Sequence, residues 1–216
     1  MIKKFAKLSA VLAAMMIALA FAGCSSDDDD GMQAVTDTDI GASGTDASSM
    51  KDIDASEIGA GTYKYTSTSK SVCEGQSYIS VEEGTVEISA DKSSVTEIRK
   101  SFKEKYSDEQ SYNDGKEEWE AEHCTVRFDD AAYTITGTYT DKNNEETFSF
   151  ADFKEDYFTL PESRDGFDHS ESYYGWSLKM SNDGARIETS YKSTWREKVE
   201  SKRQGTSEYG YILVRQ

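Results

Sequence analysis

The sequence predicts a mainly β protein that folds as a single antiparallel β-barrel or β-sandwich. Three observations support this: apolar and polar residues alternate over many short segments, turn-forming residues separate those segments, and β-branched and aromatic residues are frequent in them. All thirteen tyrosines and all three tryptophans fall within residues 59–216. This stretch is long enough for one domain with its own hydrophobic core.

The strands are expected in sequence order, each bounded by turn chemistry. An expected turn at Glu83-Gly84 separates two of them, and Asp141–Asn144 and Asn182–Gly184 provide later turns. Residues 95–106 fit a helix and a strand equally well, and the segment after Tyr191 is also open between the two. The expected strands are 62–68, 78–81, 86–88, 124–128, 133–139, 147–150, 174–180, 187–191 and 209–214.

The first 24 residues read as an export signal. Three lysines at positions 3, 4 and 7 precede an apolar stretch from Leu8 to Phe21, and Ala22-Gly23-Cys24 follows. A basic start, a short apolar region and small residues before the cut are typical of a secretory signal peptide. The alternative is an uncleaved transmembrane helix, but the apolar stretch is short against the roughly 20 residues that span a bilayer.

This segment resembles the lipobox of bacterial lipoproteins, although Phe21 stands where that family usually has Leu. The resemblance implies that residues 1–23 are removed and that the Cys24 thiol carries diacylglycerol. It also implies acylation with palmitate at the new N-terminus. Two or more acyl chains give stable anchoring, so the expected partner is a membrane, reached through an N-terminal lipid.

Residues 24–58 are expected to form a flexible acidic tether. From Ser25 to Ile58 there is no Tyr, Trp, Phe, Leu or Pro, so the segment buries too little apolar surface to offset the entropy of ordering. Ser26–Asp30 resembles the acidic export signal with which some two-membrane bacteria send lipoproteins to the outer face of the outer membrane. We therefore expect an outer-membrane anchor and display at the cell surface, with a periplasm-facing anchor as the alternative.

The charge of the mature chain excludes nucleic acid as a partner. Removing residues 1–23 leaves 41 acidic and 21 basic residues, and nucleic-acid binding needs a positive surface. With Cys24 lipidated, Cys73 and Cys124 are left, and two thiols of an exported protein usually pair. We expect a Cys73–Cys124 disulfide across neighbouring strands; the alternative is two buried thiols.

No motif indicates catalysis, a metal site or a cofactor. The sequence has no Gly-x-Ser-x-Gly, no His-x-x-Glu-His, no paired Cys-x-x-Cys and no calcium loop, and His123 and His169 are its only histidines. The run Asp27–Asp30 is dense in carboxylates but lies in the expected tether. We therefore expect a protein that is not an enzyme.

The aromatic residues near the C-terminus are the candidate ligand-binding residues. Tyr174, Trp176 and Trp195 lie close together in the sequence, and alternation places Tyr174 and Trp176 on one strand face and Tyr173 on the other. Aromatic side chains with a polar end line ligand sites and equally fill cores. Both interpretations stay open at this stage.

Residues 59–216 are similar to the small lipocalin-like domains of bacterial lipoproteins. Gly61-Thr62-Tyr63 corresponds to the Gly-x-Trp with which that family often begins, the meander 133–150 has its hairpin character, and Tyr211–Arg215 corresponds to a closing strand. The resemblance implies a β-domain that binds a small apolar or sugar ligand, or a macromolecule, at the cell envelope. The alternative is a non-catalytic structural or interaction protein without a ligand cavity.

Overall fold

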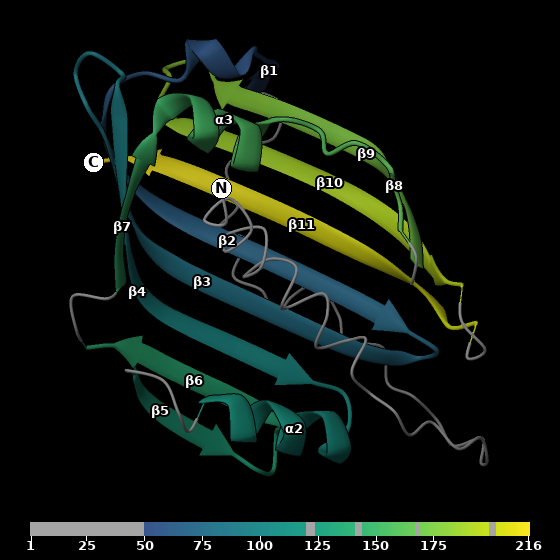
Figure 1. Cartoon of the computed structure of the whole chain (residues 1–216). Coiled ribbons are helices and arrows are strands. Elements are labelled where there is room, and N and C mark those ends of the chain that lie inside the picture. Colours follow the sequence, from purple (N-terminus) through teal and green to yellow (C-terminus); the bar gives the residue numbers. More distant parts are fainter. Residues whose placement is uncertain (1–49, 120–123, 141–143, 167–168, 199–201) are drawn as a thin grey trace.

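The computed structural model describes residues 50–119, 124–140, 144–166, 169–198 and 202–216 (Figure 1). Cys24, the signal and most of the expected tether lie outside these residues. The described helices are α2 (Glu109–Trp119), α3 (Phe150–Phe158) and the short 3-10 helix η4 (Ala55–Glu57). The described strands are β1 (Met50–Asp52), β2 (Gly61–Cys73), β3 (Gln76–Ile88), β4 (Ser94–Tyr106), β5 (Cys124–Asp129), β6 (Thr134–Tyr139), β7 (Glu145–Ser149), β8 (Arg164–Asp165), β9 (His169–Ser181), β10 (Arg186–Glu197) and β11 (Gln204–Arg215).

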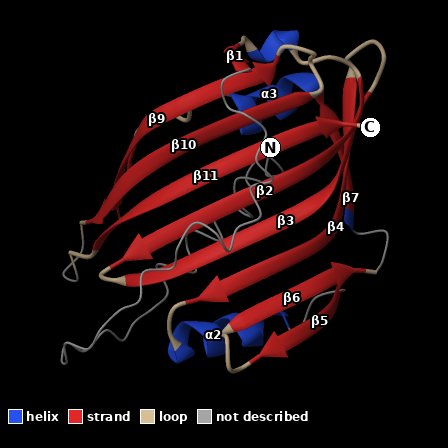
Figure 2. Cartoon of the chain, turned by 180° about the vertical axis from the view of Figure 1, so that it is seen from behind, coloured by secondary structure: helices blue, strands red, loops and turns tan. Residues whose placement is uncertain are grey.

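The protein is mainly β, and its strands form one antiparallel sheet of eleven strands, which confirms the predicted fold class. The order along the sheet is β1-β9-β10-β11-β2-β3-β4-β6-β5, with β7 beside β4 and β8 beside β9. The sheet is strongly curved and barrel-like, but its two end strands, β1 and β5, do not pair with each other (Figures 1 and 2).

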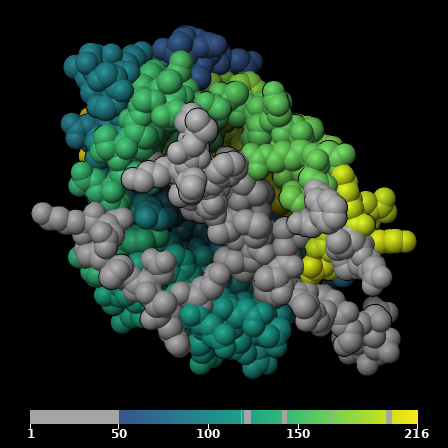
Figure 3. All heavy atoms as spheres, viewed as in Figure 1, coloured from purple at the N-terminus to yellow at the C-terminus, as the bar shows by residue number. Residues whose placement is uncertain are grey.

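Both α helices pack on the same face of the sheet, which we call the inner face. They stand in front of the strands in Figure 1 and behind them in Figure 2. In Figure 3, α3 lies toward the top of this face and α2 toward the bottom. Because side chains alternate along a strand, every second residue of each strand points to the inner face.

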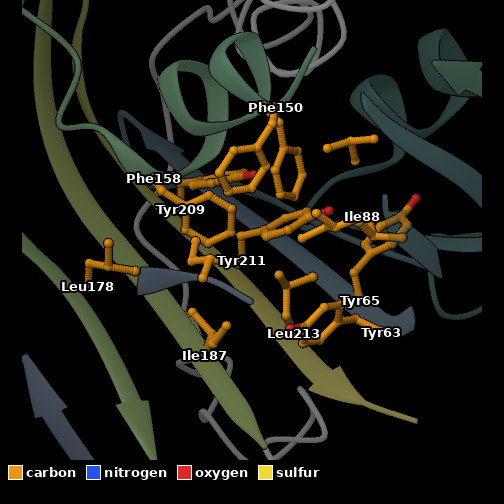
Figure 4. Packing of buried hydrophobic residues seen from close by; sticks show 14 residues of the cluster. Tyr63, Tyr65, Ile88, Phe150, Phe158, Leu178, Ile187, Tyr209, Tyr211 and Leu213 are labelled. Atoms are coloured by element: carbon orange, nitrogen blue, oxygen red, sulfur yellow. The ribbon is translucent and has the colours of Figure 1, made fainter. Parts of the chain in front are cut away.

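The larger hydrophobic cluster lies under α3. Ser149 begins this helix by accepting a hydrogen bond from the backbone N–H of Asp152. Phe153 is fully buried, and its ring centre lies 5.2 Å from that of Phe158 and 6.4 Å from that of Tyr211. Figure 4 shows Phe158 and Tyr211 packed together below the helix. This cluster joins α3 to the central strands β2 and β11.

The second cluster lies under α2 and encloses a carboxylate. Trp119 stacks on Phe102 with ring centres 4.0 Å apart. The Trp119 indole N–H donates to Oε2 of Glu104 at 2.7 Å, and the Tyr106 and Tyr78 hydroxyls donate to the two carboxylate oxygens at 2.8 Å each. Burial raises the pKa of Glu104, and these three donors act in the opposite direction. A buried carboxylate thus fixes the end of α2 to β3 and β4.

A second carboxylate, which is half-buried, lies between the two clusters. Glu82 accepts hydrogen bonds from the hydroxyls of Tyr65 at 2.8 Å and Tyr139 at 3.2 Å. Burial raises its pKa, although the nearby Arg99 guanidinium lowers it. Tyr65 also stacks on Tyr211 of the α3 cluster, with ring centres 5.4 Å apart. Glu82 therefore connects the hydrogen-bond networks of the two ends of the inner face.

The structure corrects the expected turn at Glu83-Gly84. The strand β3 runs without interruption through these residues, and the irregularity is a β-bulge opposite β4. A Cβ on Gly84 would lie 2.5 Å from the Tyr65 ring and 2.2 Å from the Ile98 carbonyl oxygen. Glycine is therefore required here by close packing rather than by a chain reversal.

The meander expected over residues 133–150 is also corrected. The strands β6 and β7 do not form a hairpin; both pair with β4, β6 along Ser101–Lys105 and β7 along Ser94–Ile98. The Asn144 side chain donates to the Arg99 carbonyl oxygen at 2.8 Å between these two stretches. The two segments thus follow one edge of β4 in turn. The two ambiguous segments are strands, β4 and β10, while the Asn182–Gly184 turn is confirmed.

The domain begins earlier than residue 59. The strand β1 pairs with β9, and the Ile53 N–H donates to the Leu178 carbonyl at 3.2 Å. The side chain of Ile58 is fully buried in the α3 cluster. Residues 50–58 therefore belong to the domain and not to the tether, because two isoleucines in a polar stretch suffice to anchor it to a core.

Deleting residues 50–58 is therefore expected to destabilise the domain. Loss of a fully buried isoleucine alone lowers the free energy of unfolding by about 2–5 kcal/mol, and the β1 hydrogen bonds are lost with it. Urea unfolding of chains that begin at residue 50 and at residue 59 measures the difference. The chain from residue 50 is the control, and equal midpoints would show that the segment contributes nothing.

The expected disulfide between Cys73 and Cys124 is wrong. Cys73 ends β2 and Cys124 begins β5, and no disulfide joins them. The strands β3, β4 and β6 lie between β2 and β5, which separates the two cysteines by about 19 Å along the sheet. A disulfide needs Cα atoms within about 7 Å. The cysteine count suggested the pairing, but it contains no information about strand order.

Candidate functional site

The inner face becomes polar at the ends of β2, β9, β10 and β11 that lie away from α3. Ser207 of β11 is opposite Ser71 on β2 and Ser193 on β10, so the three serines form a row across adjacent strands. All three are at most 4% exposed. Their strand positions alternate with outward residues, which places them on the same face as Tyr211 and the α3 cluster. We call this row the serine row.

The polar atoms in this region lack partners. The hydroxyls of Ser71, Ser193 and Ser207, and the Oε1 oxygen of Glu171, are buried and make no hydrogen bond with the described residues. A buried polar group without a partner costs about 1–3 kcal/mol, and native proteins contain few of them. Four such groups on one patch of one face indicate a binding site more readily than a core.

Tyrosines border the serine row. Tyr191 lies between Tyr173 and Tyr209, with ring-centre distances of 5.5 Å and 5.0 Å. Burial raises the pKa of all three hydroxyls, and the negative charge of Glu171 raises those of Tyr173 and Tyr191 further. These hydroxyls therefore stay protonated at neutral pH, and that of Tyr173 donates a hydrogen bond to Oε2 of Glu171 at 2.9 Å.

Trp195 borders the other side of the serine row. It lies on β10 opposite Gly205 of β11 and Glu171 of β9, and it is almost fully buried. A Cβ on Gly205 would lie 2.5 Å from the Trp195 ring, so the indole lies across β11 where a side chain is missing. The serine row is thus bounded by tyrosines on one side and an indole on the other.

The structure brings one of the three sequence-predicted aromatic residues to this site. Trp195 borders the serine row. Tyr174 pairs with Lys192, which alternation places on the outer face, and it is 48% exposed. Trp176 is 38% exposed and follows Gly175, whose φ of 62° marks an irregularity in the pairing of β9 with β10. This irregularity breaks the alternation on which the sequence-based grouping depended.

The serines and Glu171 were not identified from the sequence. A signal for them exists in β10, because every second residue of this strand shares the inner face. These residues are Thr189, Tyr191, Ser193, Trp195 and Glu197. A small hydroxyl residue between two large aromatic residues departs from the apolar pattern of a core strand. The sequence does not show, however, that Ser71 and Ser207 lie in the same row, because this depends on strand register.

A shallow hollow of about 520 Å³ lies at the same end of these strands. Its lining includes the outward residues Thr194, Thr206 and Arg196. These side chains are exposed, and none of them has a buried atom without a partner. The hollow therefore gives less support for a binding site than the serine row.

Within the described ranges, no group of three or more His, Cys, Asp or Glu side chains could hold a metal ion. No helix in this part of the chain is long and apolar enough to cross a membrane. Comparisons of the chain with models of protein families, with curated proteins and with solved structures gave no match.

Proposed function

We propose that this chain is an exported, lipid-anchored protein that binds a small hydroxylated ligand, such as a sugar, at the serine row. The signal ending in Cys24 supports export and the anchor, and the unpartnered serine hydroxyls support the ligand. The domain would then act at the cell envelope, on the outer membrane and facing the cell surface. The chain would have no catalytic role.

The buried hydroxyls determine which ligand chemistry fits. Serine and tyrosine hydroxyls both donate and accept, whereas an ionised Glu171 can only accept. A sugar offers hydroxyls that do both, and its apolar ring face packs on aromatic rings such as Trp195. An apolar ligand would leave the three serine hydroxyls and Oε1 of Glu171 unpaired, at about 1–3 kcal/mol each. A hydroxylated ligand is therefore favoured over an apolar one.

The test combines binding with stability. In the double variant Ser193→Ala/Ser207→Ala of the full chain in detergent, affinity for the best binder among glucose, galactose and N-acetylglucosamine should fall by about 1–3 kcal/mol. Stability without ligand should stay within about 0.5 kcal/mol or rise, because unpartnered hydroxyls are removed. Calorimetric titration and urea unfolding measure the two effects.

Ser190→Ala is the matched control, because Ser190 lies on the outer face of the same strand and bonds to Ser177 at 2.9 Å. It should leave binding unchanged. If no sugar binds and the double variant is merely more stable, the proposal fails. The result would then favour a structural or interaction protein of the envelope.

Cys24→Ser tests the anchor separately. Removing the thiol that accepts the lipid should leave an unacylated precursor, which moves from the detergent phase to the aqueous phase of a Triton X-114 partition. A serine in place of Cys73 or Cys124 is the control and should not change the partition. Unchanged partitioning of Cys24→Ser would exclude lipidation at this residue.

A further inference from the structure

Glu171 lies at the edge of the serine row and is only half satisfied. Its side chain is 4% exposed, and its Oε2 oxygen accepts a hydrogen bond from the Tyr173 hydroxyl at 2.9 Å. Its Oε1 oxygen has no partner among the described residues. A buried carboxylate is unfavourable unless hydrogen-bond donors or a positive group satisfy it. The Oε1 oxygen of Glu171 therefore needs a donor, and a charged donor makes the stronger hydrogen bond.

The cationic residue opposite Glu171 does not supply this donor. Arg164 of β8 is the direct partner of Glu171 in the β8–β9 register, so the two side chains share a face. No described ion pair joins the two side chains, however, and Oε1 stays without a hydrogen-bond partner. Arg164 adds positive charge nearby without neutralising the carboxylate directly.

The aromatic surroundings of Glu171 suit an ammonium group. Tyr173 and Tyr191 meet edge to face at an angle of 77°, and Trp195 is opposite Glu171 on β10. Aromatic faces attract cations, with indole the strongest, and the attraction grows when the cation is removed from water. A carboxylate oxygen beside three aromatic side chains combines an ion-pair acceptor with a cation–π surface.

We infer that the ligand of the serine row carries a protonated amine, as an amino sugar or amino alcohol does, and that Glu171 accepts a hydrogen bond from that amine. This inference rests on the proposed function, because the serine row binds the hydroxyl groups of the same ligand. Glu171 determines specificity: it separates an amine from the neutral alcohol of the same shape. The three tyrosines and Trp195 then enclose the ligand.

The experiment compares matched probes on the full chain in detergent. Glucosamine is titrated against glucose, and ethanolamine against ethylene glycol, at about pH 6, where aliphatic amines are protonated. Salt near 0.15 M screens the exposed acids. Wild type should bind at least one amine about tenfold or more tightly than its neutral counterpart, because a hydrogen bond to a charged group contributes about 1.5–3 kcal/mol.

Glu171→Gln keeps the shape and the Tyr173 contact and should abolish the preference for the amine over its neutral counterpart. Glu208→Gln is the control, because Glu208 lies on the outer face and bonds to Lys192 at 2.9 Å. Arg164→Gln keeps the preference if the amine is the partner of Glu171. If Glu171→Gln does not fold, the Arg164→Gln variant still tests the inference.

Each other outcome overturns the inference. Equal affinity for amine and alcohol in wild type shows that Glu171 does not select an amine, and the proposed function survives if those alcohols bind through the serines. A preference that Glu171→Gln retains assigns the selection to another acid. If Arg164→Gln removes the preference, the arginine and not Glu171 selects the amine. If no probe binds and neutral sugars also fail, the proposed function falls as well.

Discussion

Replacing Glu104 by alanine should lower the free energy of unfolding by about 3–6 kcal/mol. The substitution leaves two buried donors, on Tyr106 and Tyr78, and the half-buried Trp119 indole N–H without an acceptor, and each unpaired buried group costs about 1–3 kcal/mol. This is a large part of the 5–15 kcal/mol by which a domain is usually stable. Urea unfolding followed by tryptophan fluorescence reports it, since Trp119 contacts the carboxylate directly.

Glu87→Ala is the matched control for this measurement. Glu87 lies on the neighbouring strand β3 but on the outer face, and it is exposed, so its removal should change stability by no more than about 0.5 kcal/mol. A Glu104→Ala protein as stable as the control would show that the three donors form hydrogen bonds with water instead. The role assigned to this carboxylate in holding α2 would then be wrong.

Replacing Phe153 by alanine should lower the free energy of unfolding by about 3–5 kcal/mol. The ring is fully buried, with ring centres of neighbouring aromatics 5.2–6.4 Å away, among them Phe158 and Tyr211. Its removal leaves a cavity between α3 and the sheet that the rigid strands cannot close. Urea denaturation followed by far-ultraviolet circular dichroism gives the value.

Glu155→Ala, on the exposed side of the same helix, tests whether any loss comes from the helix itself. It should leave the midpoint unchanged within about 0.5 kcal/mol. Equal losses in the two variants would mean that α3 contributes through its own helicity and not through Phe153. The cluster under the helix would then be less important than its burial indicates.

Much of the sheet could be predicted from the sequence, because period-two alternation in β2, β6, β10 and β11 directly reflects one buried face. The helices could not. The segment of α2 contains Gly115 and few apolar residues. Its position depends on Trp119 meeting Glu104, and this contact between two elements does not appear in the periodicity of either segment. The helix α3 follows β7 immediately, so its aromatic residues read as the continuation of a strand.

The candidate site was predicted only in part for a similar reason. Trp195 was found because a large aromatic residue attracts notice in a sequence, whereas serines are common and uninformative one at a time. Their significance comes from register, which places Ser71, Ser207 and Ser193 side by side. The disulfide prediction was wrong for a related reason, because the spacing of two cysteines in the sequence does not give the order of strands in the sheet.

The two clusters on the inner face have a consequence for how the molecule opens. The α2 cluster holds β5 and β6 at one end of the sheet, and the α3 cluster holds β2, β10 and β11. Proteins with separate clusters open in separate cooperative units. Here Glu82 spans both, through Tyr65 on one side and Tyr139 on the other, so local opening of the α2 unit must break the half-buried hydrogen bond between Glu82 and Tyr139. The amide protons of β5 and β6 would then exchange with solvent before those of β10 and β11. The Glu82 hydrogen bonds would determine how much the two exchange rates differ.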